Sequence, residues 1–410
     1  MVRLAGLALV ILCASGCGVG ASHGSLAAAG SPSPSQGQAT ALPTVVAASP
    51  AESPSPAPTP SSTPSPSNSQ DVVCHGGASA GAMVLVRGWY MEPHLLYDVT
   101  DPVHPRLLCK ISNTSAHLFT GDTFEYLNPV SATETDVMLH SLGSGNESVA
   151  GKFPFNLSYG SWLPDMSVAA YTVQVASDVQ VWLYSQQKAA PLFTYQEPQV
   201  GCICRFGVPG QVLAVSPDGQ YLVAGPGLGL QPLAVFRVSD RTRVASLTAT
   251  SPFWDRTGHR LFLASTASVW TPEAGVASLK GATEWPFLAG ESPDASQVAY
   301  TAYSDPTSEV QPRVYTYDLR AATTRMLLDK IRTQAVFVKD GWVWYLEEAA
   351  CDPAICTGPV STLPTGNLFA MQLSAGTETP IRFAAGENPV TQSGSVDRAA
   401  FGASEFWPST

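Results

Sequence analysis

A tight turn between two short apolar runs recurs along this chain, and this recurrence restricts the fold more than any other feature. The stretch "LAVSPDGQYLVAG" occupies residues 213–225. Related stretches lie at 161–173, 251–265, 290–302 and 336–347, and all five place an Asp between the apolar runs. Ser, Pro, Asp and Gly suit such a turn, because Pro presets φ and Asp can bond its own backbone. The flanking runs are apolar on both faces, which predicts strands covered from both sides.

A second unit, a hairpin with a polar turn, alternates with the first. Seven copies lie at residues 94–111, 136–153, 179–195, 232–248, 267–281, 313–329 and 367–383. Their central aromatic or aliphatic residues recur about every 45 residues, and a period of about 40–50 residues with four strands per unit is typical of a β-propeller. The composition agrees, because 34 Gly, 34 Pro and only 13% charged residues favour an all-β fold rich in turns.

The motifs Pro217-Asp218-Gly219, Pro164-Asp165 and Pro293-Asp294, each followed by an apolar strand, resemble the TolB-type propeller repeat. The resemblance implies the fold and carries no catalytic residue over. We expect residues 74–410 to form a single propeller of seven four-stranded blades. Its first blade begins at 82–88 and is completed by the C-terminal segment 394–404, so that the N- and C-terminal strands pair and close the ring. Six or eight blades remain alternatives, because the copies at 115–127 and 394–404 are weak.

The N-terminus predicts export. Arg3 precedes an apolar run over residues 4–12, and Ala14, Ser15 and Gly16 precede Cys17, which resembles a bacterial lipobox. We expect residues 1–17 to be a lipoprotein signal peptide and Cys17 to carry the lipid. An ordinary secretory cleavage or an uncleaved anchor are alternatives, and each also exports the rest of the chain.

Residues 18–73 are dominated by Pro, Ser, Thr and Ala. Such a composition buries too little apolar surface to offset its ordering entropy, so this segment is expected to be a disordered tether. The expected location of the propeller is therefore the extracytoplasmic face of the cell membrane, held there by the lipid anchor.

Charge and surface composition restrict the partners. The chain has 21 basic and 32 acidic residues, a net charge of −11, and no basic stripe. Long-range repulsion therefore disfavours nucleic acid as a partner. We expect the chain to be a monomer. Its expected partner is an envelope protein or another surface component.

In a propeller, the connections between consecutive antiparallel strands alternate between the two faces of the disc. The first face receives the short turns, such as Pro217-Asp218-Gly219. The second face receives the long segments at 195–211, 225–232, 281–291, 303–312 and 347–366. Because long loops on a rigid scaffold commonly bind ligands, we expect recognition at the second face; loop lengths that vary without function are the alternative. The candidate binding residues there are Arg205, Trp285, Asp305, Glu309, Glu347, Glu348 and Asp352.

Once Cys13 is removed and Cys17 is lipidated, an even number of cysteines remains in an exported protein, which favours disulfides. The candidate pairs are Cys351 with Cys356, Cys202 with Cys204, and Cys74 with Cys109, although fifteen pairings are formally possible. No His adjoins the Cys202-x-Cys204 motif, so the sequence predicts no metal site there, and it predicts no cofactor.

No catalytic residue is expected. Ser79 lies in a formal G-x-S-x-G motif, but that motif needs a preceding strand and a following helix, whereas here a tether precedes and a strand follows. Glu347, Glu348 and Asp352 lack the spacing of a calcium loop. The sequence therefore favours a non-catalytic recognition module. A hydrolase or lyase with a site at the channel mouth, or a glycan or small-ligand sensor using Trp285, are the alternatives.

Overall fold

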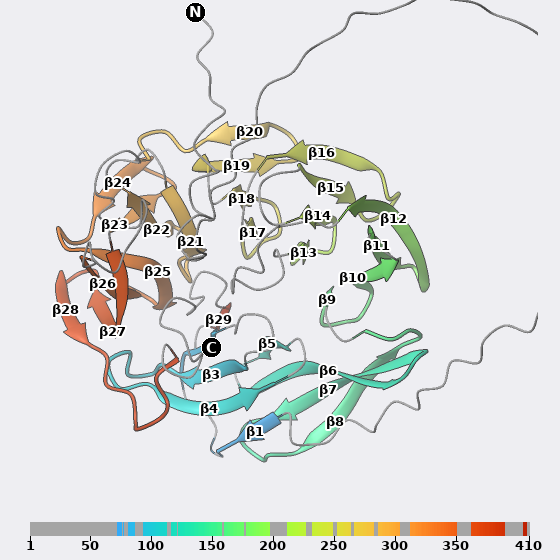
Figure 1. The fold of residues 1–410 in the computed structure, drawn as a ribbon, viewed down its shortest axis with the longest axis horizontal. Helices are drawn as coiled ribbons and strands as arrows, with labels where there is room; N and C mark the ends of the chain where they lie inside the picture. Colours follow the sequence, from blue (N-terminus) through green and yellow to red (C-terminus); the bar gives the residue numbers. More distant parts are fainter. Residues whose placement is uncertain are drawn as a thin grey trace, which may run out of the picture.

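The computed structural model describes residues 72–75, 77, 81–86, 93–112, 116–120, 122–157, 160–175, 178–196, 211–226, 232–248, 252–263, 266–282, 286–303, 312–350, 362–389 and 405–407. These residues form seven antiparallel sheets arranged as blades around a common centre (Figure 1). The predicted seven-bladed β-propeller is confirmed. Within the described ranges, no helix is both long enough and apolar enough to cross a membrane.

Six blades have four strands in sequence order. Blade 2 holds β5 (Ala116–Thr120), β6 (Thr123–Ser131), β7 (Glu134–Ser141) and β8 (Glu147–Phe153), and blade 3 holds β9 (Gly160–Trp162), β10 (Val168–Val175), β11 (Asp178–Ser185) and β12 (Lys188–Gln196). Blade 4 holds β13 (Gln211–Val215), β14 (Tyr221–Pro226), β15 (Leu233–Arg237) and β16 (Arg243–Leu247), and blade 5 holds β17 (Phe253–Trp254), β18 (Leu261–Leu263), β19 (Ser268–Thr271) and β20 (Gly275–Ser278). Blade 6 holds β21 (Pro286–Glu291), β22 (Gln297–Tyr303), β23 (Pro312–Asp318) and β24 (Thr323–Met326), and blade 7 holds β25 (Arg332–Lys339), β26 (Trp342–Ala350), β27 (Thr362–Gln372) and β28 (Thr377–Pro380).

Blade 1 closes the ring and has a fifth strand. Its order is β1-β4-β3-β2-β29, with β1 (Val72–Cys74), β2 (Met83–Val86), β3 (His94–Asp98), β4 (Arg106–Ile111) and β29 (Glu405–Trp407). The C-terminal β29 lies nearest the centre of the disc and pairs with β2, whereas β1 lies on the outer edge (Figure 1). The closure by terminal strands is confirmed, but the closing strand follows the expected segment 394–404, which lies outside the described residues. Strand β1 was not expected, and it begins within the last residues of the sequence assigned to the tether.

The repeated turn has the predicted chemistry. In blade 4, the Ser216 hydroxyl donates to Asp218 and accepts the backbone N–H of Tyr221, and the Asp218 carboxylate accepts the N–H of Gln220. Gly219 closes the turn at φ 71°, a conformation that glycine adopts without strain. The Asp therefore builds the turn.

The core lies between neighbouring blades, which explains why the strands are apolar on both faces. One buried cluster, for example, joins Val84 and Tyr97 of blade 1 to Val336 and Trp344 of blade 7. The recurring tryptophans also pack in such layers: Trp162 and Trp270 are buried, and Trp182 and Trp254 pack against the clusters of their blades. These four tryptophans therefore serve packing between the blades.

Candidate functional site

The two second-face candidates that the structure describes, Glu347 and Glu348, lie near the end of β26. Strands β26 and β27 remain paired out to Ala350 and Thr362, so this hairpin carries both ends of segment 351–361. The Glu347 carboxylate accepts hydrogen bonds from Thr365 Oγ1 at 2.9 Å and from Asn367 Nδ2 at 2.8 Å, both on the partner strand. The carboxylate thus ties the two arms of the hairpin together.

Arg332, at the start of β25, joins Glu347 to the opposite side of the blade. Its Nη1 lies 3.3 Å from Glu347 Oε1, and its Nε and Nη2 donate to the two oxygens of Glu378 on β28 at 3.0 and 3.1 Å. The guanidinium lies over the Phe369 ring at 4.6 Å, and Tyr345 donates its hydroxyl to Glu378 at 3.0 Å. We call Arg332, Tyr345, Glu347 and Glu378 the blade 7 network; it contains residues from three of the four strands, and Phe369 on the remaining strand supports it.

The ion pair between Arg332 and Glu378, at the centre of the blade 7 network, is buried. The side chains of Arg332 and Glu378 are only 6% and 9% exposed. Burial alone would raise the pKa of Glu378, but hydrogen bonds from Arg332 and Lys330 and the charge of Arg332 hold that pKa below its usual value. The pKa of Glu347 is also lowered, because the hydrogen bonds from Asn367 and Thr365 and the charge of Arg332 outweigh burial. The carboxylates of Glu347 and Glu378 therefore both bind partners within the chain. The network stabilises the hairpin of β26 and β27, and we call this stabilising role the brace.

The remaining second-face candidates lie outside the described residues. They are Arg205, Trp285, Asp305, Glu309 and Asp352, and the same holds for Cys17, Ser79, Cys202, Cys204, Cys351 and Cys356. For these residues the expectations from the sequence stay predictions.

The Cys74–Cys109 disulfide is present, one of the pairs expected from the sequence. It joins directly opposed residues of β1 and β4 at the outer edge of blade 1. Next to it, the His75 N–H donates to the Leu108 carbonyl at 2.8 Å. The disulfide therefore fastens β1, the first described segment after the tether sequence, to the propeller.

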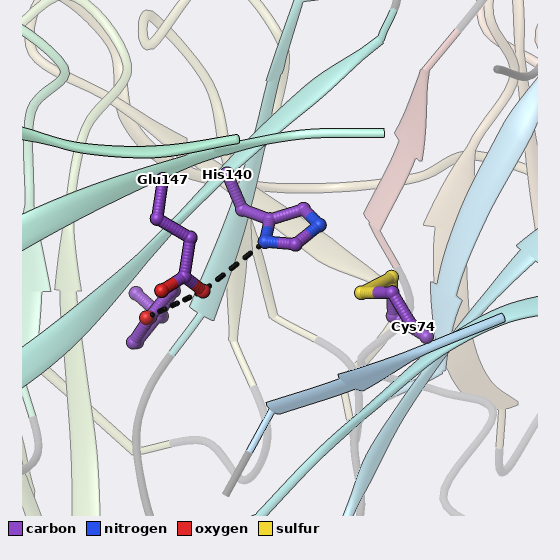
Figure 2. Close-up of a disulfide and its surroundings, with 5 residues drawn as sticks. Cys74, His140 and Glu147 are labelled. Carbon is purple, nitrogen blue, oxygen red and sulfur yellow. Dashed lines mark hydrogen bonds and ion pairs between the residues drawn. A yellow bond between two sulfur atoms is a disulfide. The ribbon is translucent and has the colours of Figure 1, made fainter. Parts of the chain in front are cut away.

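A histidine and a glutamate that the sequence analysis did not single out lie beside this disulfide (Figure 2). His140 is on β7 of blade 2, and its Nδ1 is 3.2 Å from Glu147 Oε1. Tyr126 donates its hydroxyl to the same oxygen at 2.9 Å. The potential ligand atoms of Cys74, Cys109 and His140 all lie within 4.8 Å of one another, and among the described residues they form the one such group.

A second polar contact missed from the sequence lies between the inner strands of blades 2 and 3. Glu125 is 5% exposed and accepts a hydrogen bond from the indole Nε1 of Trp162 at 3.2 Å. Burial raises the pKa of Glu125, and the Trp162 hydrogen bond opposes that rise. His117 is the cross-strand neighbour of Glu125 and contacts Trp162 edge-on, with ring centroids 4.2 Å apart. Only the alternation of inward- and outward-facing residues along β5 and β6 could have indicated the contact between Glu125 and Trp162. The weak repeat at 115–127 made that alternation hard to recognise.

Several solved structures are similar to this chain at low identity and low TM-score. TolB from Acinetobacter baumannii is 12% identical, with a TM-score of 0.34 over 74% of this chain and 64% of the TolB chain. The periplasmic gluconolactonase PpgL of Pseudomonas aeruginosa is 15% identical, with a TM-score of 0.41 over 74% and 95% of the two chains. A putative 6-phosphogluconolactonase from Bacteroides uniformis is 10% identical, with a TM-score of 0.41 over 80% and 100%.

The alignments span 64% of the TolB chain and 50% of a matching prolyl endopeptidase. No protein-family model matches the sequence, and no curated protein sequence matches it. These similarities concern the propeller fold alone.

Proposed function

We propose that this chain is an exported, lipid-anchored propeller that binds a protein or another component of the bacterial cell envelope through its second face, as a non-catalytic recognition module. The observation that supports this role is the hairpin of β26 and β27. Its strands stay paired to Ala350 and Thr362, and the blade 7 network holds them together. A loop presented on a rigid sheet loses less conformational entropy on binding than a free loop does. Segment 351–361 is thus the best supported contact element.

The membrane part of the proposal rests on the N-terminal sequence. Cys17 follows three small residues, and residues 18–71 provide a spacer between the lipid and the disc, whose first strand begins at Val72. A flexible spacer of this length reaches roughly 40 Å, and an extended polyproline form reaches several times further. The propeller would then contact components well away from the lipid surface.

Shortening the loop should remove partners selectively. A variant in which a short Gly-containing turn replaces residues 351–361 keeps Glu347, Thr365 and Asn367 in place, so the brace should persist. We expect chemical crosslinking followed by pull-down from native membranes to recover fewer partners with this variant than with the intact chain.

The matched control for the shortened loop alters a first-face turn through Asp240→Ser and Arg241→Gly. Arg241 has φ 58°, so glycine fits its backbone. The control should recover the same partners as the intact chain. Identical partner sets from the intact chain and the shortened-loop variant would refute recognition through this loop.

Substituting the lipidation site should release the protein from the membrane. With Cys17→Ala, a bacterial host can still export the chain but cannot attach the lipid, so the protein should move from the membrane pellet to the soluble extracytoplasmic fraction. Cys13→Ala is the matched control and should remain in the pellet. If the Cys17→Ala protein pellets at the level of the parent, lipidation at this residue is wrong.

A further inference from the structure

The imidazole of His140 has one nitrogen satisfied and one without a partner. The side chain is buried, with the residue 7% exposed, and Nδ1 lies against the Glu147 carboxylate. Nε2 is also buried and has no hydrogen-bond partner in the described structure. A buried polar atom left unpaired costs about 1–3 kcal/mol, so such an atom requires an explanation.

The surroundings of His140 fix which nitrogen carries the proton. An ionised carboxylate only accepts hydrogen bonds, so Glu147 places the proton on Nδ1 and leaves a lone pair on Nε2. Tyr126 anchors the same carboxylate oxygen, and Phe124 stacks on the imidazole with ring centroids 5.0 Å apart. The ring is therefore held between the Glu147 carboxylate and the Cys74–Cys109 disulfide (Figure 2). A carboxylate that holds one nitrogen of an imidazole while the other carries a free lone pair is the usual arrangement of a metal-binding histidine.

The two sulfurs supply the other donors. They lie in directly opposed residues of β1 and β4, with Cα atoms 4.1 Å apart, and each lies within 4.8 Å of a His140 nitrogen. Tetrahedral zinc, with Zn–S of about 2.3 Å and Zn–N of about 2.0 Å, needs ligand atoms roughly 3.5–3.8 Å apart. Once the S–S bond is open, side-chain rotations that move the ligand atoms by about 1 Å would bring them to that separation.

We propose that reduction of the Cys74–Cys109 disulfide creates a site for one thiophilic d10 cation, Zn²⁺ or Cu⁺, held by the two thiolates and His140 Nε2. A dithiol reductant gives two electrons and two protons to the disulfide and is itself oxidised to a disulfide. The S–S bond breaks and two thiols form. The cation then forms two metal–sulfur bonds and one metal–nitrogen bond, and the two thiol protons go to solvent. Thiolate and imidazole donors suit these ions.

A cation at this site would link the outer edge of blade 1 to blade 2. In the oxidised protein, the disulfide joins β1 to β4 within blade 1. A bound cation would add a bond to His140 on β7 of blade 2. Cys109 already packs in the cluster between these blades with Ala116, Phe124 and Leu142.

Metal titration of the reduced protein tests the site. The full chain is prepared with its six other cysteines replaced by serine, treated with a phosphine reductant without oxygen, and freed of that reductant. Co²⁺ serves as the spectroscopic probe, Zn²⁺ is then added to displace it, and Cu⁺ is titrated separately against a chelator. We expect one Co²⁺ per reduced chain, with a sulfur-to-cobalt charge-transfer band, and no band for the oxidised chain.

Three variants separate the site from a general effect of thiols. His140→Gln should weaken binding at least tenfold, and Glu147→Gln should weaken it by about tenfold through the orientation of His140. His104→Gln is the matched control, because His104 is exposed and paired with Asp101, and it should bind as the parent does. Melting curves of the oxidised variants, in which the disulfide is intact, report folding independently. The proposal is overturned if the reduced parent binds less than one metal per chain, or if His140→Gln binds as tightly as the parent.

Discussion

Replacing Arg332 by methionine is expected to lower the free energy of unfolding by about 3–5 kcal/mol at neutral pH. Methionine keeps an apolar side chain over Phe369 but removes the cation between Glu347 and Glu378. The buried Glu378 carboxylate and the partly buried Glu347 carboxylate are then left without that cation, and this accounts for the cost. Urea denaturation followed by tryptophan fluorescence measures the change.

The pH dependence distinguishes charge from packing in this variant. In the parent, the folded-state pKa values of Glu347 and Glu378 lie below the ordinary glutamate value of 4.5. The stability that these groups contribute is present above that ordinary value and is lost as the pH falls through the lowered values. In the variant, the cation no longer opposes burial, so both pKa values rise relative to the parent and acidification protonates the carboxylates at a higher pH. The stability gap between variant and parent should therefore narrow between about pH 7 and pH 4.

Arg237→Met provides the matched control. Arg237 pairs with Asp240 on the surface, where both side chains are 47% exposed, and solvent screens such pairs strongly. This control should unfold close to the parent. A stability gap for Arg332→Met that stays constant across the pH range would show that the loss comes from packing rather than charge.

The architecture was predictable because its signals are local. The turn at residues 216–219 is built from contacts within a few residues, so its chemistry can be read from the sequence. Because the turn recurs from blade to blade, its recurrence helps to predict the number of blades. The outer strand β1 was not predicted, because a strand of three residues is too short to show the alternation of apolar and polar residues. The closing β29 was placed too early for the same reason.

The polar networks were not predictable, because they depend on register between distant strands. Arg332 meets Glu378 only through the stacking of four strands and an irregular β25, where the pairing with β26 shifts between Thr333 and Val336. His140 meets Cys74 only because blades 1 and 2 pack together. A single sequence carries no record of such contacts between blades. The segments expected to form much of the second face, including residues 351–361, lie outside the described residues, so that part of the site stays a prediction.

Replacing Trp344 by alanine is expected to lower the free energy of unfolding by about 3–5 kcal/mol and to loosen the join between blades 7 and 1. Trp344 is fully buried, and its indole donates to the Pro102 carbonyl of blade 1 at 3.0 Å. It also packs edge-on against Tyr97 of blade 1 and Phe383, with ring centroids 6.3 and 6.0 Å apart. The substitution leaves a cavity at this join and removes the partner of a buried carbonyl. Urea denaturation measures the loss, and hydrogen exchange locates it in β2, β3 and β26.

Trp270→Ala is the matched control for the join between blades 7 and 1. Trp270 is equally buried but packs against Tyr221 and Trp254 in the layer between blades 4 and 5. It should lose comparable stability, with faster exchange confined to those blades. The closing pair β2–β29 has only three residue pairs, whereas the cluster around Trp344 spans both blades. If packing holds the ring closed, Trp344→Ala must speed exchange in blade 1 as well as in blade 7. Faster exchange in blade 7 alone would mean that the β2–β29 pairing is sufficient for closure.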